Sequence, residues 1–425
     1  MSFIKIIALL GFGVVGSGVV ELVHRNKKEN FLKYNEEIVI GKILVRDKEK
    51  YRNSPYYELV TDSFEEVLAL NPDVAVEVMG GLQPSYTYVR ELLGRGIPVV
   101  TANKDLIAEY GEELINFSIQ KLTPLKYEAS VGGGIPVLRS VEESLMGNRI
   151  DWIAGILNGT TNFILTKMHD EGMDYSAALK LAQELGFAEA NPDSDVKGLD
   201  ASRKLSILSS LAYDRNIAWQ SIPVEGIGAV DKQDMAYAKL FNCKLKLLAT
   251  SCIRNDRVYA AVRPTLVRND STLARFDNEY NVIEVHGDAV GELTFSGKGA
   301  GKLPTASAVY SDVLNIFNGK RTMPEYRFKE LESVQPNWPL KSKWLLRIAT
   351  PSRKQLLTSL FRIFSSFPVE VINTEGSDLL AMVESPNEQV LVNKLNELRT
   401  LPAAESVKCL FCFDEENFQT LSRRQ

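Results

Sequence analysis

Short apolar segments alternate with segments of helical periodicity along about the first 135 residues. Continuous apolar runs of four to eight residues are typical of buried strands, and apolar positions that recur every three or four residues are typical of helices. The predicted strands cover residues 4–10, 37–45, 73–79, 97–104 and 125–131, and the predicted helices cover residues 14–25, 61–70, 84–96 and 111–122. This alternation predicts a parallel sheet with helices on both faces, that is, an α/β doubly wound domain of the Rossmann type.

From about residue 136 the pattern changes to longer helices and polar loops. Residues 199–214 show the helical period, whereas residues 255–267 and 278–297 are typical of antiparallel strands. The apolar segment between Cys243 and Cys252 is expected to be helical. These elements predict a mixed α+β domain in the middle of the chain.

The last 80 or so residues follow a segment that contains prolines and a tryptophan, ESVQPNWPLKSK, and form a separate pattern. The expected elements are strands at 343–350, 369–376, 378–385 and 405–413, and helices at 353–367 and 388–401. Their order is β-α-β-β-α-β, which is the ferredoxin-like arrangement.

The composition is ordinary for a soluble globular protein, because the 425 residues are 45% hydrophobic and 24% charged. The formal net charge of −5 gives no reason to expect nucleic acid or an anionic membrane as a partner. No apolar run approaches the ~20 residues of a membrane span. Four cysteines are too few for a disulfide framework in so long a chain, which indicates a reducing compartment and hence the cytoplasm.

The N-terminal segment MSFIKIIALLGFGVVGSGVV has the lysine, apolar run and small residues of a secretory signal. Its small residues, however, form G-x-G-x-x-G at Gly11, Gly13 and Gly16, between a predicted strand and a predicted helix. In that context the first glycine permits a turn, the second lets the backbone approach a pyrophosphate, and the third lets helix and strand pack closely. We therefore favour a dinucleotide-binding loop, which includes Phe12 and Val15, over a merely tight turn.

The second predicted strand ends in LVRDKEKYR, where basic side chains surround one carboxylate. An NAD site usually has an acidic residue here that holds the ribose 2′-hydroxyl, and Asp47 is placed to do so. Arg46 precedes it, and arginine binds a 2′-phosphate through two parallel hydrogen bonds. We predict NADP as the cofactor, with NAD as the alternative. Lys48 and Lys50 are equally well explained as a solvated basic turn.

The predicted helix LDASRKLSILSSLAYD has one apolar face and carries two opposite charges near its start. Asp200 lies in the first turn, and Lys204 follows one turn later on the same side. Partial desolvation beside the apolar face and a neighbouring carboxylate would both suit a catalytic acid. The alternative is an ordinary surface ion pair. We expect Asp193, Lys197 and Arg203 to face solvent.

Six segments carry a resemblance to a known family. They are GFGVVG (11–16), TANK (101–104), EASVGGGIPV (128–137), GILNGTTNFIL (155–165), LGFAEANPDSDVKGLDASRKL (185–205) and GKGAGKLPTASAV (297–309). In this order and spacing the chain resembles the homoserine dehydrogenases over essentially its full length. The resemblance implies NAD(P)-dependent interconversion of L-aspartate 4-semialdehyde and L-homoserine, on the route to threonine and methionine. It also implies a monofunctional enzyme that is a homodimer or homotetramer.

The resemblance further implies roles for individual residues. Lys204 would donate the proton to the carbonyl oxygen, Asp200 would orient it, and Lys104 would share the acid role. Glu189 and Asp195 would bind the substrate, Glu189 through the substrate ammonium. The cofactor contacts that it implies beyond the glycine loop are Thr101, Lys104 and Gly301.

The glycine-rich segment EASVGGGIPV looks like a second phosphate loop, but in the family it binds a structural sodium ion. The resemblance places the ligands at Glu128 and at the backbone carbonyls of Val131, Gly133 and Ile135. Such oxygen ligands suit a hard cation. The alternative is a strand-to-helix turn in which Pro136 begins the helix.

The C-terminal part is similar to ACT-type regulatory domains, which follow the catalytic part in many relatives. Such domains usually have a glycine between the first strand and first helix, where the backbone meets an amino-acid ligand. The corresponding turn here, ATPSRKQLL, has no glycine. Feedback binding of threonine or another amino acid is therefore a hypothesis. The expected domains are residues 1–135 plus about 305–340 for dinucleotide binding, 136–304 for catalysis and dimerisation, and 343–425 for regulation.

Two alternative functions are open. An aldehyde-oxidising enzyme such as aspartate-semialdehyde dehydrogenase shares the fold and the metabolite but needs a nucleophilic cysteine. None of Cys243, Cys252, Cys409 and Cys412 lies in a glycine-rich setting, so we expect them to be structural. A non-catalytic amino-acid sensor would predict a damaged catalytic stretch, which this sequence does not show.

Overall fold

The computed structural model describes residues 3–34, 36–319, 331–372 and 378–414. The chain divides into two compact units. The first comprises Met1–Gly147, Arg203–Trp219 and Phe295–Glu332, and the second comprises Asn148–Ser202, Gln220–Thr294 and Ser333–Gln425. Each unit is therefore assembled from segments that are far apart in the chain.

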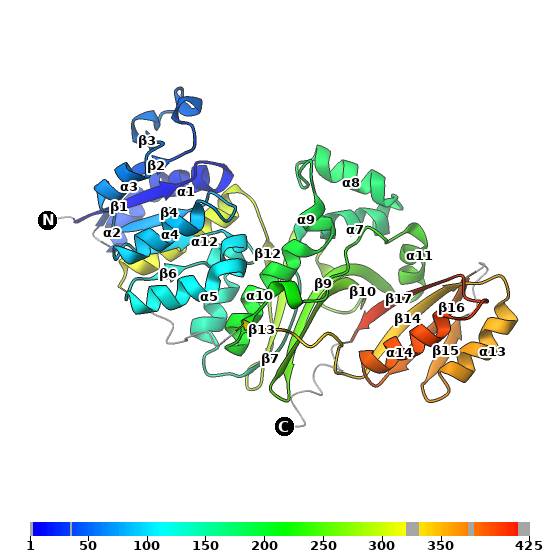
Figure 1. The fold of residues 1–425 in the computed structure, drawn as a ribbon. Coiled ribbons are helices and arrows are strands. Elements are labelled where there is room, and N and C mark those ends of the chain that lie inside the picture. The colour runs from blue at the N-terminus through cyan, green and yellow to red at the C-terminus, as the bar shows by residue number, and fades with distance from the viewer. Residues whose placement is uncertain (1–2, 35, 320–330, 373–377, 415–425) are drawn as a thin grey trace. The chain divides into compact units, whose positions relative to one another are not determined.

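The first unit is built on a six-stranded sheet whose strands are all parallel. In sheet order they are β3 (Val60–Thr61), β2 (Glu36–Leu44), β1 (Phe3–Leu10), β4 (Val74–Glu77), β5 (Val99–Thr101) and β6 (Leu125–Lys126). Apolar side chains of the central strands are buried on both faces, which explains the continuous apolar runs in the sequence. The predicted doubly wound α/β class is confirmed (Figure 1).

Helices pack around this sheet. They are α1 (Val14–Arg25), α2 (Lys27–Tyr34), α3 (Phe64–Leu70), α4 (Ser85–Gly94), α5 (Lys104–Gln120), α6 (Val137–Arg139) and α12 (Lys302–Phe317), with a π-helical turn at Ser140–Ser144 and 3₁₀ turns at Lys48–Tyr51, Tyr57–Leu59 and Glu128–Ser130. Helices α1 and α12 approach each other so closely that a side chain at Gly18 would collide with the Lys302 carbonyl and with Ala306. A late segment of the chain thus completes the first unit.

Three local predictions for the first unit are wrong. The strand expected at 125–131 ends at Lys126, because Glu128–Ser130 form a 3₁₀ turn. The strand expected at 97–104 ends at Thr101, and α5 begins at Lys104 rather than at residue 111. The cause is Asn103, whose side chain accepts a hydrogen bond from the Leu106 amide at 3.1 Å and so caps the helix early. Helix α2 was not predicted at all, because its eight residues, KKENFLKY, are mostly polar and show no apolar stripe.

A nine-stranded mixed sheet forms the framework of the second unit. Its first five strands, in sheet order, are β12 (Gly291–Lys298), β11 (Tyr280–Gly287), β7 (Ile150–Ile156), β9 (Cys243–Arg254) and β10 (Arg257–Arg268). Strands β9 and β10 pair antiparallel along their whole length. The helix expected between Cys243 and Cys252 is therefore wrong, since this segment lies within β9. The strand is buried on both faces, so its sequence lacks the alternation that identifies strands.

Helices of the second unit lie between these strands in the sequence. They are α7 (Gly159–Glu171), α8 (Tyr175–Glu184), α9 (Asp193–Val196) and α11 (Lys232–Leu240), with 3₁₀ turns at Trp219–Ser221 and Leu273–Arg275. Helix α10 (Leu199–Tyr213) begins in the second unit and, from Arg203 on, belongs to the first. The strand β8 (Asn216–Ile217) that follows it pairs with β13 (Leu331–Glu332). Within the described residues, no helix is both long and apolar enough to span a membrane.

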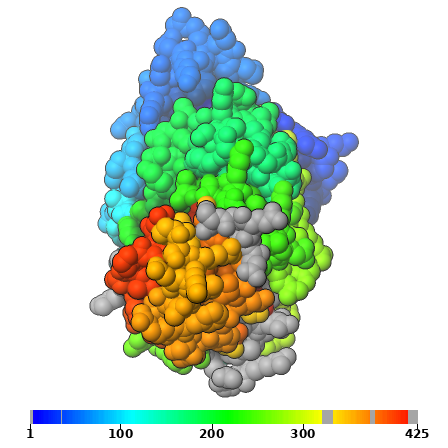
Figure 2. Space-filling view, turned by 90° about the vertical axis from the view of Figure 1, so that its right-hand side faces the viewer, coloured from blue at the N-terminus to red at the C-terminus, as the bar shows by residue number. Residues whose placement is uncertain are grey.

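The C-terminal part of the second unit has the predicted β-α-β-β-α-β order. Its elements are β14 (Ser342–Ala349), α13 (Arg353–Ile363), β15 (Val369–Ile372), β16 (Asp378–Ser385), α14 (Glu388–Arg399) and β17 (Ser406–Phe413). The strand order β17-β14-β16-β15 is that of a ferredoxin-like sheet, which confirms the arrangement. Figure 2 shows these residues gathered in one orange and red patch. Strand β17 also pairs in parallel with β10, so one continuous sheet and one core join this part to the rest of the unit.

Candidate functional site

The glycine loop that follows β1 has the geometry of a phosphate-binding turn. Gly11 has a φ of +104°, and a side chain there would lie 2.7 Å from the Val78 carbonyl oxygen. A side chain at Gly16, in the first turn of α1, would collide with the Gly11 carbonyl. At Gly13, by contrast, an added methyl group meets no atom within 4 Å. The first and third glycines are therefore required by the fold, whereas the second leaves open space beside the helix N-terminus.

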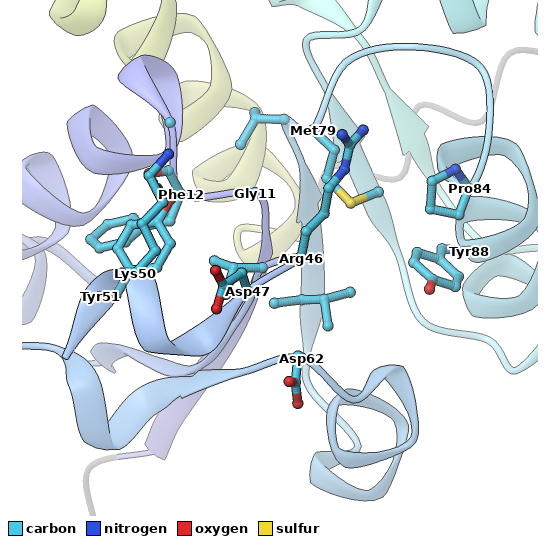
Figure 3. A pocket seen from close by; sticks show the side chains of 14 residues that line it. Gly11, Phe12, Arg46, Asp47, Lys50, Tyr51, Asp62, Met79, Pro84 and Tyr88 are labelled. Atoms are coloured by element: carbon cyan, nitrogen blue, oxygen red, sulfur yellow. Dashed lines mark hydrogen bonds between the residues drawn. The ribbon is translucent and has the colours of Figure 1, made fainter.

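A pocket of about 420 Å³ opens at this loop, within the first unit (Figure 3). The loop contributes Phe12 and Gly13, and the end of β2 and the turn after it contribute Arg46, Asp47 and Lys50. Figure 3 shows Arg46 and Asp47 extending in different directions. The structure thus brings the glycine loop and the basic strand end together around one cavity, as a dinucleotide would require.

The charged side chains that follow β2 make different contacts. Asp47 accepts a hydrogen bond from the Glu49 amide at 3.0 Å and caps the next 3₁₀ turn. Lys48 lies over the ring of Tyr57, 5.0 Å from its centroid, and does not line the pocket. Within the described residues, Arg46 makes no ion pair. The strand end therefore presents both a cation and a carboxylate to the pocket, and one oxygen of that carboxylate caps the next turn.

The carboxyl ends of β4 and β5 meet beside this pocket through a buried carboxylate. Glu77 is fully buried and accepts hydrogen bonds from the Thr101 hydroxyl at 2.6 Å and the Met79 amide at 2.9 Å. Burial raises the pKa of Glu77 above its ordinary value. Thr101 is thus held by Glu77, and Lys104 opens α5 three residues later. The sequence reading missed Glu77, although an acidic residue at the end of a buried strand, as in DVAVEVM, is a signal for such a role.

The structure brings together, within the second unit, Asp195, which was predicted to bind the substrate, and Asp200, which was predicted to orient Lys204. The Asn158 side-chain amide donates to the Asp195 carboxylate at 2.8 Å and to the Asp200 carboxylate at 2.8 Å. Thr160 donates to the other Asp195 oxygen at 3.1 Å. Asp200 is only 4% exposed, and the half-buried Lys204 follows it one turn later on α10. Asn158 and Thr160, which hold these aspartates, were not predicted as site residues, although both lie in the segment GILNGTTNFIL that carries the family resemblance.

The remaining charged residues around α10 behave differently from one another. Glu189 is exposed in the loop between α8 and α9, and no hydrogen bond joins its side chain to the aspartate pair within the described residues. Asp193 and Lys197 form an exposed ion pair at 2.7 Å, as expected for solvent-facing side chains. The prediction for Arg203 is wrong. Its side chain is 20% exposed, pairs with Asp105 at 3.4 Å and lies over the Trp219 ring, because the helix turns that side toward the first unit's own residues.

The glycine-rich segment after β6 is a tight turn around a buried carboxylate. Glu128 accepts hydrogen bonds from the Leu138 and Arg139 amides at 3.0 and 2.7 Å, so it caps the start of α6. Burial, and then the Asp312 carboxylate, raise the pKa of Glu128 to about 7. Gly133 has a φ of +58° and lies against the Gly299 backbone. The segment is thus a strand-to-helix turn that also holds a buried carboxylate.

The oxygen donors of this turn fit a hard cation in part. Within the described residues, no hydrogen bond is made to the carbonyls of Val131 and Gly133, whereas the Ile135 carbonyl accepts one from the Val137 amide at 2.9 Å. Each Glu128 oxygen keeps a second lone pair beyond its amide contact. Free carbonyls beside a buried carboxylate are what sodium would require.

The other predicted cofactor contact, Gly301, precedes α12 in the first unit. Its φ of +118° is one that residues with side chains rarely adopt, and its carbonyl accepts the first hydrogen bond of the helix from Thr305. The four cysteines are free, and none lines the nucleotide pocket. Burial raises the pKa of the Cys243 thiol to about 11, and that of Cys412 to about 12. Thiols of this kind are poor nucleophiles, which disfavours the aldehyde-oxidising alternative.

A parallel doubly wound sheet, a G-x-G-x-x-G loop that opens a helix, and a pocket at the carboxyl end of the strands define the chain as a dinucleotide-binding α/β protein. Comparison with known proteins narrows this class. Residues 11–123 match the family description "Homoserine dehydrogenase, NAD binding domain", and residues 136–314 match "Homoserine dehydrogenase". The chain belongs to the homoserine dehydrogenase family.

Relatives and solved structures agree with this assignment. The homoserine dehydrogenase of Lactococcus lactis is 34% identical over 98% of this chain and 97% of its own length. That of Bacillus subtilis is 41% identical over 74% of this chain and 73% of its own. The crystal structure of a homoserine dehydrogenase from Thiobacillus denitrificans covers 97% of this chain and all of its own, with a TM-score of 0.89 and 31% identity. A hyperthermophilic archaeal homoserine dehydrogenase in complex with NADPH covers 75% of this chain and 98% of its own, with a TM-score of 0.63 and 26% identity.

Proposed function

We propose that this enzyme interconverts L-aspartate 4-semialdehyde and L-homoserine in amino-acid biosynthesis, with NAD(P) as the hydride carrier. The observation that carries the proposal is the pair Asp200 and Lys204. They lie one turn apart on α10, and the buried Asp200 is held next to Asp195 by one amide. Such an arrangement provides one cation for a carbonyl oxygen and carboxylates for an amino-acid ammonium.

The dinucleotide supplies a hydride to the aldehyde carbon, and the chain supplies the proton. As the carbonyl oxygen gains negative charge, the Lys204 ammonium stabilises it and transfers a proton to it, which yields the alcohol. In the direction of oxidation, neutral Lys204 takes the hydroxyl proton. Asp200 orients the lysine from the preceding turn, and Lys104, at the first position of α5, shares the acid role.

The amino-acid end of the substrate calls for negative charge. Asp195 and Glu189 are assigned to the substrate ammonium. Asp195 is held by Asn158 and Thr160, whereas Glu189 is exposed and reaches the substrate from a loop. A fixed carboxylate sets the position of the substrate more narrowly than a mobile one, so Asp195 carries more of this role.

For the cofactor we assign NADP, with NAD also accepted. Arg46 lines the pocket without an ion-pair partner in the described part of the chain, and Asp47 is engaged as a cap. A guanidinium binds a 2′-phosphate in a bidentate manner, and Lys50 adds a second cation. The NADPH complex of the archaeal relative supports this choice. Thr101 and Gly301 complete the assigned cofactor contacts.

For the turn after β6 we assign a structural sodium ion to Glu128 and to the carbonyls of Val131, Gly133 and Ile135. The support is a buried carboxylate whose pKa lies near 7, together with two carbonyls that receive no hydrogen bond within the described residues. Sodium would keep this carboxylate ionised and hold the start of α6. Replacing sodium by a large organic cation should then lower the melting temperature of the wild type but not that of Glu128→Gln.

For residues 343–425 we assign an ACT-type regulatory domain, and for the enzyme a homodimer or homotetramer in the cytoplasm. The support for the domain is the ferredoxin-like strand order. Feedback binding of threonine is the hypothesis for its role. Calorimetry that detects no heat with millimolar threonine, together with no change in kinetics, would reject that hypothesis.

The central experiment is oxidation of L-homoserine by the purified enzyme with NADP and with NAD, alongside Lys204→Ala. The variant should lose at least about a hundredfold in kcat, because the proton transfer loses its acid. Lys197→Ala, which removes an exposed lysine of the same region, is the matched control and should keep wild-type kinetics. Inactivity of the wild type with both cofactors rejects the function. Retained activity of Lys204→Ala moves the acid role to Lys104.

A further inference from the structure

Asn158 stands between β7 and α7, and its side-chain amide is fully used. The carbonyl oxygen accepts from the Thr161 amide at 2.8 Å and from the Thr161 hydroxyl at 3.0 Å, so it caps α7. The two hydrogens of the nitrogen go to Asp195 and Asp200, each at 2.8 Å. The backbone amide of Thr161 can only donate, so the oxygen must face it and the nitrogen must face the two carboxylates. The geometry therefore allows one orientation of this amide.

Two carboxylates that share one neighbour repel each other, and burial adds to the cost of charge. Asp200 is 4% exposed and Asp195 is half-buried, so water solvates the Asp200 carboxylate poorly. One amide that donates to both anions offsets the repulsion and fixes their separation. The N-terminus of the 13-residue α7 adds positive potential at the same place.

Thr160 supports the pair in a more limited way. Its hydroxyl lies 2.7 Å from the Phe187 carbonyl and 3.1 Å from Asp195, and one hydroxyl proton serves one of them at a time. The Asn158 amide, in contrast, contacts both aspartates at once. This amide therefore links Asp195, which is assigned to the substrate, with Asp200, which lies one turn before Lys204 on α10.

We propose that Asn158 is a positioning residue of the dehydrogenase reaction, which acts by clamping Asp195 and Asp200 in one arrangement. This inference rests on the proposed function, because it gives the clamped carboxylates their tasks. Removal of the amide would displace Asp195 from the substrate ammonium. It would also displace Asp200 from its position one turn before Lys204. Both the KM for homoserine and kcat would then change, whereas the KM for the dinucleotide would not.

The competing explanation is that Asn158 serves the fold as a helix cap and nothing else. Asn158→Asp separates the two, since aspartate caps a helix as well as asparagine does but cannot donate to a carboxylate. The matched control is Asn387→Asp at the cap of α14, where the side chain accepts from Val390 at 3.0 Å. Both variants keep their cap, and one of them removes the clamp.

We expect Asn158→Asp to lose about 10- to 100-fold in kcat/KM for homoserine, as two charge-assisted hydrogen bonds are lost. Its KM for the dinucleotide should match that of Asn387→Asp, whereas its melting temperature should be lower, because a third carboxylate then lies beside Asp195 and Asp200. Asn158→Ser, which keeps a capping oxygen and one donor, should fall between Asn158→Asp and the wild type. If Asn158→Asp fails to fold, Asn158→Ser provides the test. A lower kcat/KM for homoserine at an unchanged melting temperature then supports the clamp.

The outcomes separate the clamp from the function on which it rests. A wild-type enzyme that does not oxidise homoserine rejects the function. An active wild type whose Asn158→Asp and Asn158→Ser variants stay within twofold in kcat/KM rejects the clamp alone. A fall in melting temperature that lowers kcat and raises both KM values together also rejects it, because it shows a structural role.

Discussion

Arg347 on β14 and Asp234 on α11 form an ion pair of 3.0 Å that ties the C-terminal part to the rest of the second unit. The Asp234 side chain is completely buried, and Lys408 on β17 also pairs with it. Arg347 extends further, to Asp231 and Asp378, each at 2.7 Å. Side chains alternate along a strand, so Arg347 points away from the sheet face that packs on α13 and α14. Acidic side chains at the start of α11 thus reach the other face of the ferredoxin-like sheet.

Loss of this buried anion should destabilise the enzyme strongly. Asp234→Asn leaves Arg347 and Lys408 facing each other without their shared partner, and we expect the free energy of unfolding to fall by about 3 kcal/mol. Asp270→Asn, which breaks an exposed pair with Arg268, should change it by less than about 1 kcal/mol. Urea denaturation of the two variants measures the difference. Equal effects would show that burial of Asp234 contributes nothing.

The glycines of the cofactor loop should separate folding from binding. Gly13→Ala meets no atom within 4 Å, so it should fold normally, but its methyl group should raise the KM for the dinucleotide roughly tenfold or more. Gly16→Ala collides with the Gly11 carbonyl and should lower the melting temperature. Gly147→Ala, which also enters open space but lies outside the pocket, is the control. Thermal denaturation and cofactor titration test both; unchanged binding by Gly13→Ala would place the pyrophosphate elsewhere.

Cofactor choice should depend on Arg46. We expect Arg46→Ala to raise the KM for NADP about tenfold or more, because a charge-assisted contact with the 2′-phosphate is lost. The KM for NAD, which has no such phosphate, should stay the same. Lys48→Ala removes a cation that lies over Tyr57 outside the pocket lining, and should change neither value. A parallel change for both dinucleotides in Arg46→Ala would contradict the assignment.

The buried carboxyl of Glu128 should make stability depend on pH. Its pKa is about 7 in the folded chain against an ordinary value of 4.5, so the folded chain holds the proton more tightly. The raised pKa of Glu128 therefore adds to the free energy of unfolding below about pH 4.5. This added stability is lost as the pH rises toward about 7. The stability of Glu128→Gln relative to the wild type should increase across this window by up to about 3 kcal/mol. If sodium binds the ionised form as proposed, it should flatten the dependence in the wild type alone. Parallel curves for the wild type and Glu128→Gln in sodium-free buffer would refute the raised pKa.

Several features of the fold could be predicted from local sequence pattern. The doubly wound class follows from apolar runs that alternate with helical segments, and the glycine loop from three residues at a fixed spacing before a helix. The ferredoxin-like order of the C-terminal part follows in the same way. Local pattern predicted the wrong element at β9, because a strand buried on both faces does not alternate apolar and polar residues. It also predicted the wrong environment for Arg203, which packs on Trp219 instead of facing water.

The contacts between polar groups, in contrast, depend on the three-dimensional fold. Asn158 is 37 residues from Asp195 and 42 from Asp200, and Glu77 is 24 residues from Thr101. No periodicity encodes such contacts, since they depend on how loops fold back onto strand ends, and a hydrogen bond requires placement to within a few tenths of an ångström. The sequence could therefore nominate Asp195, Asp200 and Lys204, whereas the amide that holds two of them in place became visible only in the folded chain.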